Sequence, residues 1–447
     1  MAKTDESLYG ALCRLTESDI VPMHMPGHKR NPKFGITGAK ADITEIQGYD
    51  NLHAASGSIK EIENSLAKLY SAKRSFLLVN GSTVGLLSAI FTAADDGDKI
   101  IIARNCHKSV YSACLLRHLN VVYADPKFDE IHGIYTELEQ AEADRLIKLH
   151  PDAKAIVLTV PTYEGITSCI TAKIPIIADG AHAAHFPFGD FPKYPSADIV
   201  ISSLHKTLPA LTQTAVANIY NEKFTQRFKF FIDIFETSSP SYLLMASASR
   251  CCEYLHNSKR DFAEYSALLD KFYSKTKLRN LLFIPNDDKS RICVSTSKCN
   301  INGSELAEAL RNKFGIEPEA AYLEHVILIS TVADTEKNLD ALSTALTEID
   351  SLLTPAKPKS LQKPPCDGKV HKITLPKEFE ATALENCIGK ICAEFIYAYP
   401  PDIPLITPND EITADFLKLI REFKAAGTEL VSDSGLLISN CILTKQS

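Results

Sequence analysis

The stretch SFLLVNGSTVGLLSAIFTA, residues 75–93, decides the fold class of this 447-residue chain. Its apolar start is typical of a short strand, NGST marks a glycine turn, and the apolar segment that follows predicts a helix. Residues 98–119, DKIIIARNCHKSVYSACLLRHL, repeat this order, and further short apolar runs lie at 120–125, 155–163 and 174–182. Near-continuous apolar strands that alternate with helices predict an α/β fold with a mostly parallel sheet covered on both faces.

Shifts in composition predict how the chain is divided. Residues 1–50 are irregular and rich in turn formers, and residues 51–285 carry the large α/β domain. Residues 286–355 alternate strand and helix patterns and predict a small α+β domain. The Pro- and Lys-rich stretch at 354–365 is typical of a linker, and residues 366–447 then form a C-terminal domain.

Two helices can be placed from their own residues. IKEIENSLAKLY, residues 59–70, has apolar residues at helical spacing. NINGSELAEALRNKFG predicts a helix that begins near Asn302 or Ser304 and ends at Gly315, because these residue types favour helix starts and stops.

Charge and composition exclude several classes of protein. The net charge of -7 argues against a general nucleic-acid binder, and no apolar run approaches the length of a membrane span. The first residues, MAKTDESLYGALCRL, lack the apolar core of a secretory signal. The twelve cysteines are scattered and form no paired CxxC motifs, so we expect free thiols and a cytoplasmic protein.

Polar residues cluster where the predicted strands end. The clusters lie at 80–83, 105–108, 162–164, 179–182 and 202–206. In open α/β sheets, ligands bind beyond the carboxyl ends of the strands. The sequence therefore predicts a functional site at that edge of the sheet.

Asp179 and Lys206 suggest what this site binds. Each follows an apolar strand, and a carboxylate that ends a buried strand needs a partner. A structural salt bridge between them is one interpretation. The other is that both face pyridoxal phosphate, with Lys206 supplying the amine and Asp179 keeping the pyridine nitrogen protonated.

The remaining needs of pyridoxal phosphate also have candidates. A glycine turn that opens a helix supplies backbone N–H groups and hydroxyls for a phosphate, and the residues here are Gly81, Ser82 and Thr83. His107 follows another strand and is a candidate to stack on the ring. Ser203 and His205 flank the lysine and are candidates for phosphate contacts.

Each of these features has a simpler interpretation when it stands alone. A GST turn is more often a helix cap, and a single lysine is more often a surface cation. Asp179, His182 and His185 also form a DxxHxxH pattern that a metal can use. No further His or Cys set at ligand spacing supports a metal, so we expect none, and the order of the features favours pyridoxal phosphate.

Eight stretches in sequence order carry a resemblance to a known family. They are HMPGHKR (24–30), DITEIQGYDNLH (42–53), LVNGSTVG (78–85), ARNCHKS (103–109), ADGAHAAHF (178–186), SSLHKTLPALTQTA (202–215), TSSPSYLLMAS (237–247) and AYPPDIPLITP (398–408). Together they resemble the bacterial ornithine/lysine/arginine decarboxylases, which are pyridoxal-phosphate enzymes of fold type I. The resemblance covers almost the whole chain, and its length is similar to that of short members without an N-terminal wing domain.

The resemblance implies a fold, a reaction and a set of roles. It implies an aspartate-aminotransferase-like fold with a mostly parallel seven-stranded-type sheet and small α+β C-terminal domains. The implied reaction converts arginine, lysine or ornithine to the amine and CO2, feeding polyamine synthesis in a homodimer or tetramer. The implied catalytic residues are Lys206 (the Schiff-base lysine), His107, Asp179 and His205. The implied cofactor-binding set is Gly81, Ser82, Thr83, His107, Asp179, Ala181, His182, Ser203, His205, Lys206 and, from across a dimer interface, Ser239.

The chain departs from the family pattern at three positions. Gly180 stands where many relatives have an acidic residue, Ala183 stands where many have glycine, and Asp402 replaces the glycine of YPPGIP. These positions flank the site and so bear on substrate choice. A carboxylate is expected to clamp the distal cation of the substrate, and the candidates are Glu164, Asp50 and Glu394.

Two other functions stay open at this point. The first is another fold type I enzyme, such as an aminotransferase or a different lyase, for which Arg291 and Arg421 are weak candidates to clamp the substrate carboxylate. The second is a catalytically silent regulatory homologue. The joint presence of Lys206, Asp179 and His107 favours an active enzyme.

Overall fold

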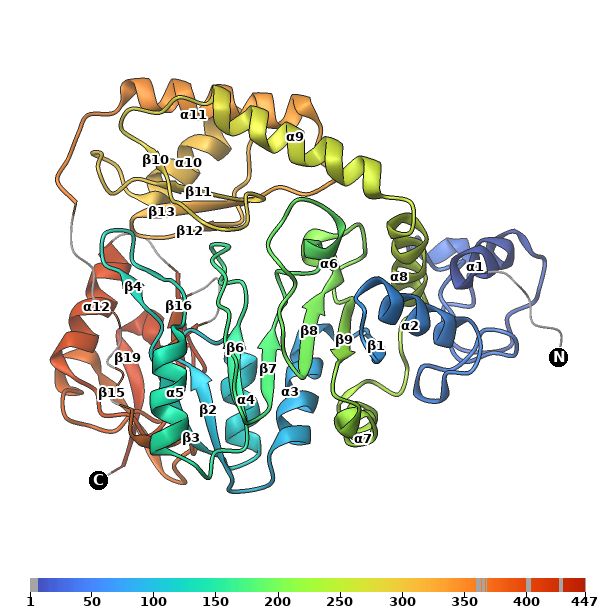
Figure 1. Ribbon diagram of the computed structural model, residues 1–447, viewed down its shortest axis with the longest axis horizontal. Helices are drawn as coiled ribbons and strands as arrows, with labels where there is room; N and C mark the ends of the chain where they lie inside the picture. The colour runs from blue at the N-terminus through green and yellow to red at the C-terminus, as the bar shows by residue number, and fades with distance from the viewer. Residues whose placement is uncertain are drawn as a thin grey trace. The chain divides into compact units, whose positions relative to one another are not determined.

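The opening stretch folds as a strand, a turn and a helix. In the computed structural model, β1 (Arg74–Leu78) is followed by α3 (Gly81–Ala93). The structure describes residues 7–358, 363, 366, 368–398, 403–425 and 429–446. Figure 1 shows its helices and strands. The chain divides into two compact units, each built from two segments. The first unit comprises Met1–Ala93 and Ile177–Ala263, and the second comprises Ala94–Ile176 and Glu264–Ser447.

The first unit contains four adjacent strands in the order β1, β9 (Ala215–Ile219), β8 (Ile199–Ser203) and β7 (Ile176–Asp179). β7 and β8 run parallel, whereas β9 runs antiparallel to both β8 and β1. The parallel pair places the ends of β7 and β8 at the same edge, which is where the predicted site residues follow.

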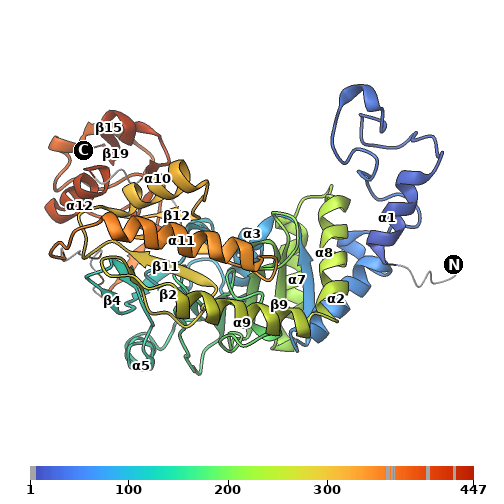
Figure 2. The ribbon, with the colours of Figure 1, turned by 90° about the horizontal axis from the view of Figure 1, so that it is seen from above.

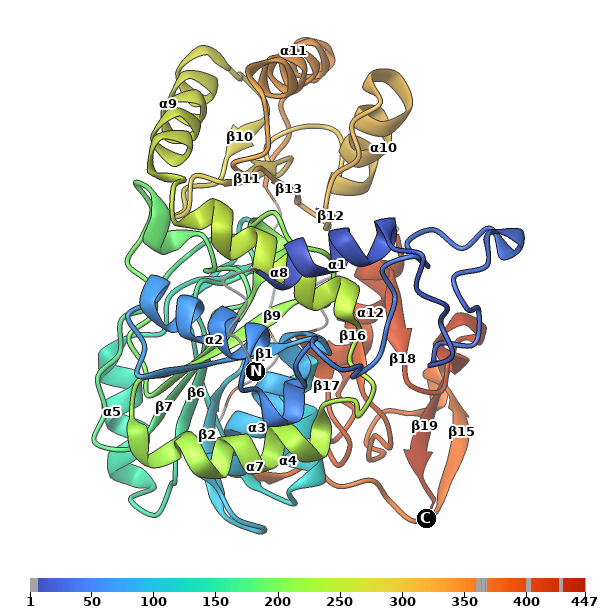
Figure 3. The ribbon, with the colours of Figure 1, turned by 90° about the vertical axis from the view of Figure 1, so that its right-hand side faces the viewer.

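Helices cover this part of the sheet. α3 packs on β1, β8 and β9 because Gly85 presents no side chain: a Cβ there would lie 2.7 Å from Ile201 Cγ2. α7 (Thr225–Phe235) packs against α3, and α2 (Ser58–Leu69) packs against β1. α8 (Tyr242–Leu255) contacts α2 and also α1 (Leu8–Glu17), as Figure 3 shows.

Residues 18–41 of the first unit form loops that project beyond α1, away from the strands (Figure 2). Their large apolar side chains face solvent, with exposed fractions of 73% at Val21 and 86% at Met23. Such a stretch of exposed apolar residues is unusual on an isolated molecule.

The second unit contains strands in the order β6 (Ile156–Thr159), β2 (Lys99–Ala103), β3 (Asn120–Ala124) and β14 (Val370–Lys372). β2 runs parallel to β6 and β3, and β14 is antiparallel to β3. The connecting elements are α4 (Lys108–Leu116), α5 (Gln140–Leu149) and a hairpin of β4 (Phe128–Asp129) and β5 (Ile134–Tyr135). The mostly parallel α/β pattern predicted from the sequence is confirmed, with β9 and β14 as antiparallel additions.

A four-stranded antiparallel sheet in the second unit has the order β10 (Leu282–Phe283), β11 (Arg291–Ser295), β13 (His325–Ile329) and β12 (Ala320–Ala321). α9 (Lys259–Lys275), α10 (Gly303–Phe314) and α11 (Glu336–Leu352) accompany it. The predicted helix ends are confirmed. Asn302 caps α10 in a capping box with Glu305, and Gly315 ends it in a left-handed conformation.

The C-terminal part of the second unit has its own apolar cluster, which includes Ile396, Ile420 and Ile442. Its strands and helix are β15 (Phe379–Ala383), β19 (Cys441–Lys445), β16 (Ile396–Ala398), β17 (Ile403–Ile406), β18 (Leu430–Ser432) and α12 (Ala414–Ala425). The domain limits predicted at residues 50, 285 and 355 stay predictions. All twelve cysteines are free thiols. In the part of the chain that the structure describes, no helix is both long and apolar enough to cross a membrane.

Candidate active site

Lys206 lies just beyond the carboxyl end of β8, in the single turn α6 (Leu204–Thr207). The Leu204 N–H donates to the Thr214 carbonyl at 3.0 Å, which fixes the turn. His205 Nδ1 lies 2.9 Å from the same carbonyl and must donate, because a carbonyl only accepts. Burial lowers the pKa of His205, which favours the neutral ring with Nε2 as an acceptor.

His182 is in contact with the lysine. Its Nε2 lies 3.1 Å from Lys206 Nζ, and the His182 side chain is buried. His182 follows the end of β7 by three residues, so the geometry of the parallel strands produces this contact. An amine and an imidazole at this distance can pass a proton between them.

Asp179 is the last residue of β7 and is 3% exposed. Its Oδ1 accepts from the Ala181 N–H at 3.1 Å, and the Gly180 N–H donates to the Ile201 carbonyl of β8 at 2.8 Å. Asp179 and Lys206 therefore lie at the carboxyl ends of two adjacent parallel strands, at the same edge of the sheet, as the sequence predicted.

The glycine turn is tied to the segment that follows Lys206. Gly81 begins α3 with φ +76°, a conformation that suits glycine, and its N–H donates to the Gln213 carbonyl at 2.9 Å. The first N–H groups of a helix have no partner within that helix and attract anions. Ser82 is half-buried and Thr83 is exposed at this helix start.

Two hydroxyls near the lysine are buried without a partner. Ser203 Oγ and Thr207 Oγ1 have no hydrogen bond among the residues that the structure describes, and the two side chains are 0% and 2% exposed. An unsatisfied buried hydroxyl is costly, so a polar ligand group is its expected partner. Together with the start of α3, these hydroxyls fit a cofactor that carries a phosphate.

The other predicted cofactor residues are placed as follows. Ala181 is buried beside Asp179. Ser239 is exposed in the connection between α7 and α8, and its N–H donates to Thr237 Oγ1 at 3.2 Å. His107 belongs to the second unit, where it caps α4 and its Nδ1 accepts from the Ser109 N–H at 3.2 Å. The cap is a structural role, and stacking on a cofactor ring stays a prediction.

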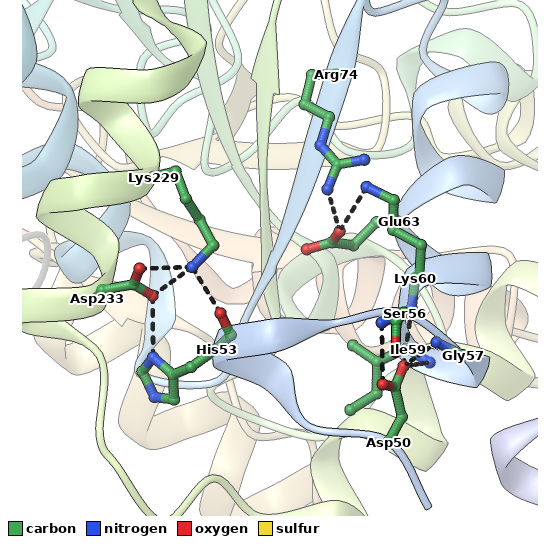
Figure 4. Close-up of polar contacts among 10 residues, drawn as sticks. All are labelled: Asp50, His53, Ser56, Gly57, Ile59, Lys60, Glu63, Arg74, Lys229 and Asp233. Carbon is green, nitrogen blue, oxygen red and sulfur yellow. Dashed lines mark hydrogen bonds and ion pairs between the residues drawn. The ribbon is translucent and has the colours of Figure 1, made fainter.

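Two candidates for the substrate clamp bond to backbone N–H groups. The Asp50 carboxylate accepts from four backbone N–H groups at the start of α2, those of Ser56, Gly57, Ile59 and Lys60 (Figure 4). The Glu394 carboxylate accepts from the N–H groups of Ser434 at 2.9 Å and Leu443 at 2.7 Å. These bonds hold the backbone around each carboxylate, and the role of Asp50 or Glu394 as the substrate clamp stays a prediction.

The third clamp candidate is a buried acid. Burial raises the pKa of Glu164 to about 7. The hydrogen bond from Thr162 and the charge of Arg291 lower this pKa, but burial has the larger effect. Arg291 itself is fully buried, and Gly165 packs against the Cβ and Cγ atoms of its side chain and against Asp288. An arginine held in this way gives no support to the role of carboxylate clamp in an aminotransferase. Asp402 lies outside the described residues.

Sequence reasoning missed two residues of this site. Thr207 adds a buried hydroxyl, and Gln213 receives the bond from Gly81 with φ +77°. Both lie inside the 202–215 stretch, so the motif pointed to the segment but not to these atoms. Among the described residues, no group of three or more His, Cys, Asp or Glu side chains is arranged to hold a metal.

A lysine and a carboxylate at the ends of adjacent parallel strands, next to a helix start and unpartnered hydroxyls, define a class: the fold type I enzymes that use pyridoxal phosphate. Comparison with known proteins agrees. Residues 7–280 match the family model described as Orn/Lys/Arg decarboxylase, major domain. The chain belongs to this family and is an amino-acid carboxy-lyase.

Individual relatives cover the chain almost completely. An arginine decarboxylase of Halalkalibacterium halodurans is 28% identical, with 94% of each chain aligned. The uncharacterized protein YaaO of Bacillus subtilis is 31% identical over 91% of this chain and 92% of its own. The constitutive lysine decarboxylase of E. coli has the same fold, with a TM-score of 0.76 over 98% of this chain and 82% of that chain at 17% identity.

Proposed function

We propose that this protein decarboxylates a basic amino acid, with arginine, lysine and ornithine as the candidate substrates, and releases the amine and CO2. The observation that carries the proposal is the contact of Lys206 Nζ with His182 Nε2 at 3.1 Å, beside Asp179 at the end of the next parallel strand. The names of the relatives, arginine and lysine decarboxylases, support a basic substrate. The amine product is a precursor for polyamine synthesis.

The chain's residues divide the work of binding. Pyridoxal phosphate supplies an electron sink for the bond that breaks at the substrate Cα. Lys206 would hold the cofactor, and the buried Asp179 carboxylate would favour the protonated form of its ring nitrogen. The first turn of α3, with Gly81, Ser82 and Thr83, and the hydroxyls of Ser203 and Thr207 hold the phosphate. Ala181 would lie against the ring, His107 stays the candidate from the sequence for stacking on it, and Ser239 would contribute from the partner copy.

Protons move through Lys206 and two histidines. His182 Nε2 takes a proton from Lys206 Nζ and so leaves the amine neutral, which is the form that reacts. His205 is held by Thr214 through Nδ1, so only its Nε2 can exchange a proton with the substrate. The proton that Cα needs after CO2 leaves would come from Lys206, or from His205 once its Nε2 has taken up a proton.

The protein is proposed to act as a homodimer or tetramer in the cytoplasm. The exposed apolar residues of the 18–41 loops support an interface with a second copy. A cavity of about 500 Å³ lies beside them, lined by residues of α1, α8 and the segment after Lys206, among them Leu12, Leu211 and Leu243. Twelve free thiols suit a reducing compartment.

A decarboxylation assay tests the function. Purified protein with added pyridoxal phosphate is incubated with arginine, lysine or ornithine, and both CO2 and keto acid are measured. The proposal expects CO2 and the matching amine from at least one substrate, and none from Lys206→Ala. Formation of a keto acid would favour an aminotransferase, and cofactor binding without any product would favour a silent homologue.

A further inference from the structure

The connection between α7 and α8 holds the start of the phosphate turn. Glu236 Oε1 accepts from the Val79 N–H at 3.0 Å, and Asn80 Oδ1 accepts from the Thr237 N–H at 3.1 Å. Val79 and Asn80 immediately precede Gly81, where α3 begins. The position of the connection at residues 236–241 therefore sets the position of the first N–H groups of α3.

His53 anchors this connection from the other side. Its Nε2 lies 2.8 Å from the Thr237 carbonyl and its Nδ1 lies 3.0 Å from Asp233 Oδ1. A carbonyl and an ionised carboxylate only accept, so both ring nitrogens must carry a proton. This geometry requires the imidazolium form of His53.

Lys229 reinforces the anchor. Its Nζ donates to the His53 carbonyl at 2.9 Å and to both carboxylate oxygens of Asp233, as Figure 4 shows. The Asp233 carboxylate is thus shared by a lysine and a histidine, and the backbone of His53 is fixed as well as its ring.

We propose that His53, as an imidazolium, is a positioning residue for the phosphate site. It holds residues 236–241 against the start of α3, and it no longer does so once it is deprotonated. The inference rests on the proposed function, since it assumes that the start of α3 binds the cofactor phosphate. His53 itself does not touch the cofactor in this proposal.

The charges around His53 set the direction of its pH response. Burial lowers its pKa, but the bonds to Thr237 and Asp233 outweigh burial, so the pKa of His53 lies above its usual value although Lys229 opposes the shift. Two acids nearby also titrate in this range. Burial raises the pKa of Glu236 to about 7, and it raises the pKa of Glu63 on α2 to about 8 although the charge of Lys229 lowers it.

The titrations of His53, Glu236 and Glu63 act in the same direction, because the pKa of each is raised. A histidine with a raised pKa gives its full stabilisation below its unfolded pKa and loses it as pH rises through the folded value. Glu236 likewise becomes a buried charge as pH rises through about 7. Cofactor retention is therefore expected to weaken between mildly acidic and mildly alkaline pH.

Four variants separate these contributions. Cofactor dissociation constants are measured from about pH 6 to about pH 9 on the wild type and on four variants: His53→Gln, His53→Ala, Glu236→Gln and the control His118→Ala. Gln keeps one neutral donor for the Thr237 carbonyl, so His53→Gln should bind as wild type at low pH and lose part of the pH dependence. His53→Ala removes both donors and should bind about fivefold more weakly at low pH. His118→Ala is the matched control, because His118 Nδ1 pairs with Asp96 at 2.9 Å on the surface of the other unit.

Hydrogen exchange provides a readout that needs no cofactor. In the apoprotein, the amides of Val79 and Thr237 should exchange faster in His53→Ala than in wild type or His118→Ala, because each of the two bonds joins the anchored connection to the residues before α3: Val79 donates to Glu236, and Thr237 donates to Asn80. This measurement also decides the outcome where His53→Ala binds poorly for reasons of folding.

The outcomes are distinct. Wild-type affinity and wild-type exchange in His53→Ala would overturn the inference and leave the proposed function intact. A pH profile that survives in His53→Gln and disappears in Glu236→Gln would also overturn it, in favour of Glu236. A wild-type protein that binds no cofactor at any pH would instead overturn the proposed function.

Discussion

Two histidines near Lys206 differ in what their surroundings allow. Sequence reasoning assigned the catalytic role to His205, which precedes the lysine. In the structure, His205 is bonded through Nδ1 to Thr214, whereas His182 contacts the lysine Nζ directly. The partner of the lysine amine is thus His182, which follows Asp179 and lies 24 positions before the lysine in sequence.

His182→Gln tests this assignment. The variant should retain the cofactor, since Lys206 and the residues proposed to bind the cofactor phosphate are unchanged. Its kcat should fall by about a hundredfold because a proton acceptor is lost. The pH profile of kcat should lose one limb, with KM little changed. An unaltered pH profile would contradict the role of His182, and His118→Ala serves as the control.

The unpartnered hydroxyls give a second test at the same scale. In Ser203→Ala and Thr207→Val no hydrogen bond is lost in the apoprotein, so its melting temperature should stay the same or rise. Each variant should bind pyridoxal phosphate about tenfold more weakly, because a bond to a charged phosphate is lost. A variant that melts lower without the cofactor but binds it normally would show that the hydroxyl has a structural partner.

Which residues the sequence could identify depended on how local their roles are. Asp179 and Lys206 were predicted because each follows an apolar strand, and parallel strands bring their ends together. The bonds of the Glu394 carboxylate could not be predicted, because its partners are backbone N–H groups of distant segments, such as Leu443. Residue type and spacing carry no signal for such partners.

At the scale of elements, the close approach of α3 to the sheet depends on Gly85. A Cβ there would lie 2.7 Å from Ile201 Cγ2 and 2.8 Å from Leu78 Cδ1. Gly85→Ala should therefore lower the free energy of unfolding by about 1–3 kcal/mol through overpacking. Chemical denaturation measures this.

Gly27→Ala is the matched control for this prediction. No atom lies within 4 Å of a Cβ at Gly27, so the same chemical change should be nearly neutral there. Equal effects of the two substitutions would contradict the packing account of α3.

Helix ends were predictable from the sequence, and strand directions were only partly so. The start of α10 at Asn302 and its end at Gly315 depend on residues within the helix and its caps. The antiparallel direction of β9 depends instead on the connection through residues 204–214, which turns back beside β8 rather than crossing over the sheet. The residues of a short, mostly apolar strand such as Ala215–Ile219 do not indicate whether the strand runs parallel or antiparallel to its neighbours.

At the scale of the whole molecule, the exposed residues of the 18–41 loops predict self-association. The double substitution Val21→Glu and Met23→Glu should shift the protein toward the monomer in light scattering, because charges would be buried at the interface. Ile438→Glu is the control, since Ile438 is 87% exposed on the second unit. A wild-type protein that is monomeric at micromolar concentration would contradict the proposed interface.

The central claim is that Lys206 carries the cofactor. Borohydride reduction of the protein loaded with pyridoxal phosphate fixes the bond between cofactor and lysine, and mass spectrometry of the peptides then locates it. The account predicts the added mass on the peptide that contains Lys206, and no such peptide from Lys206→Ala. A label on a different lysine, or no label on the wild-type protein, would contradict it.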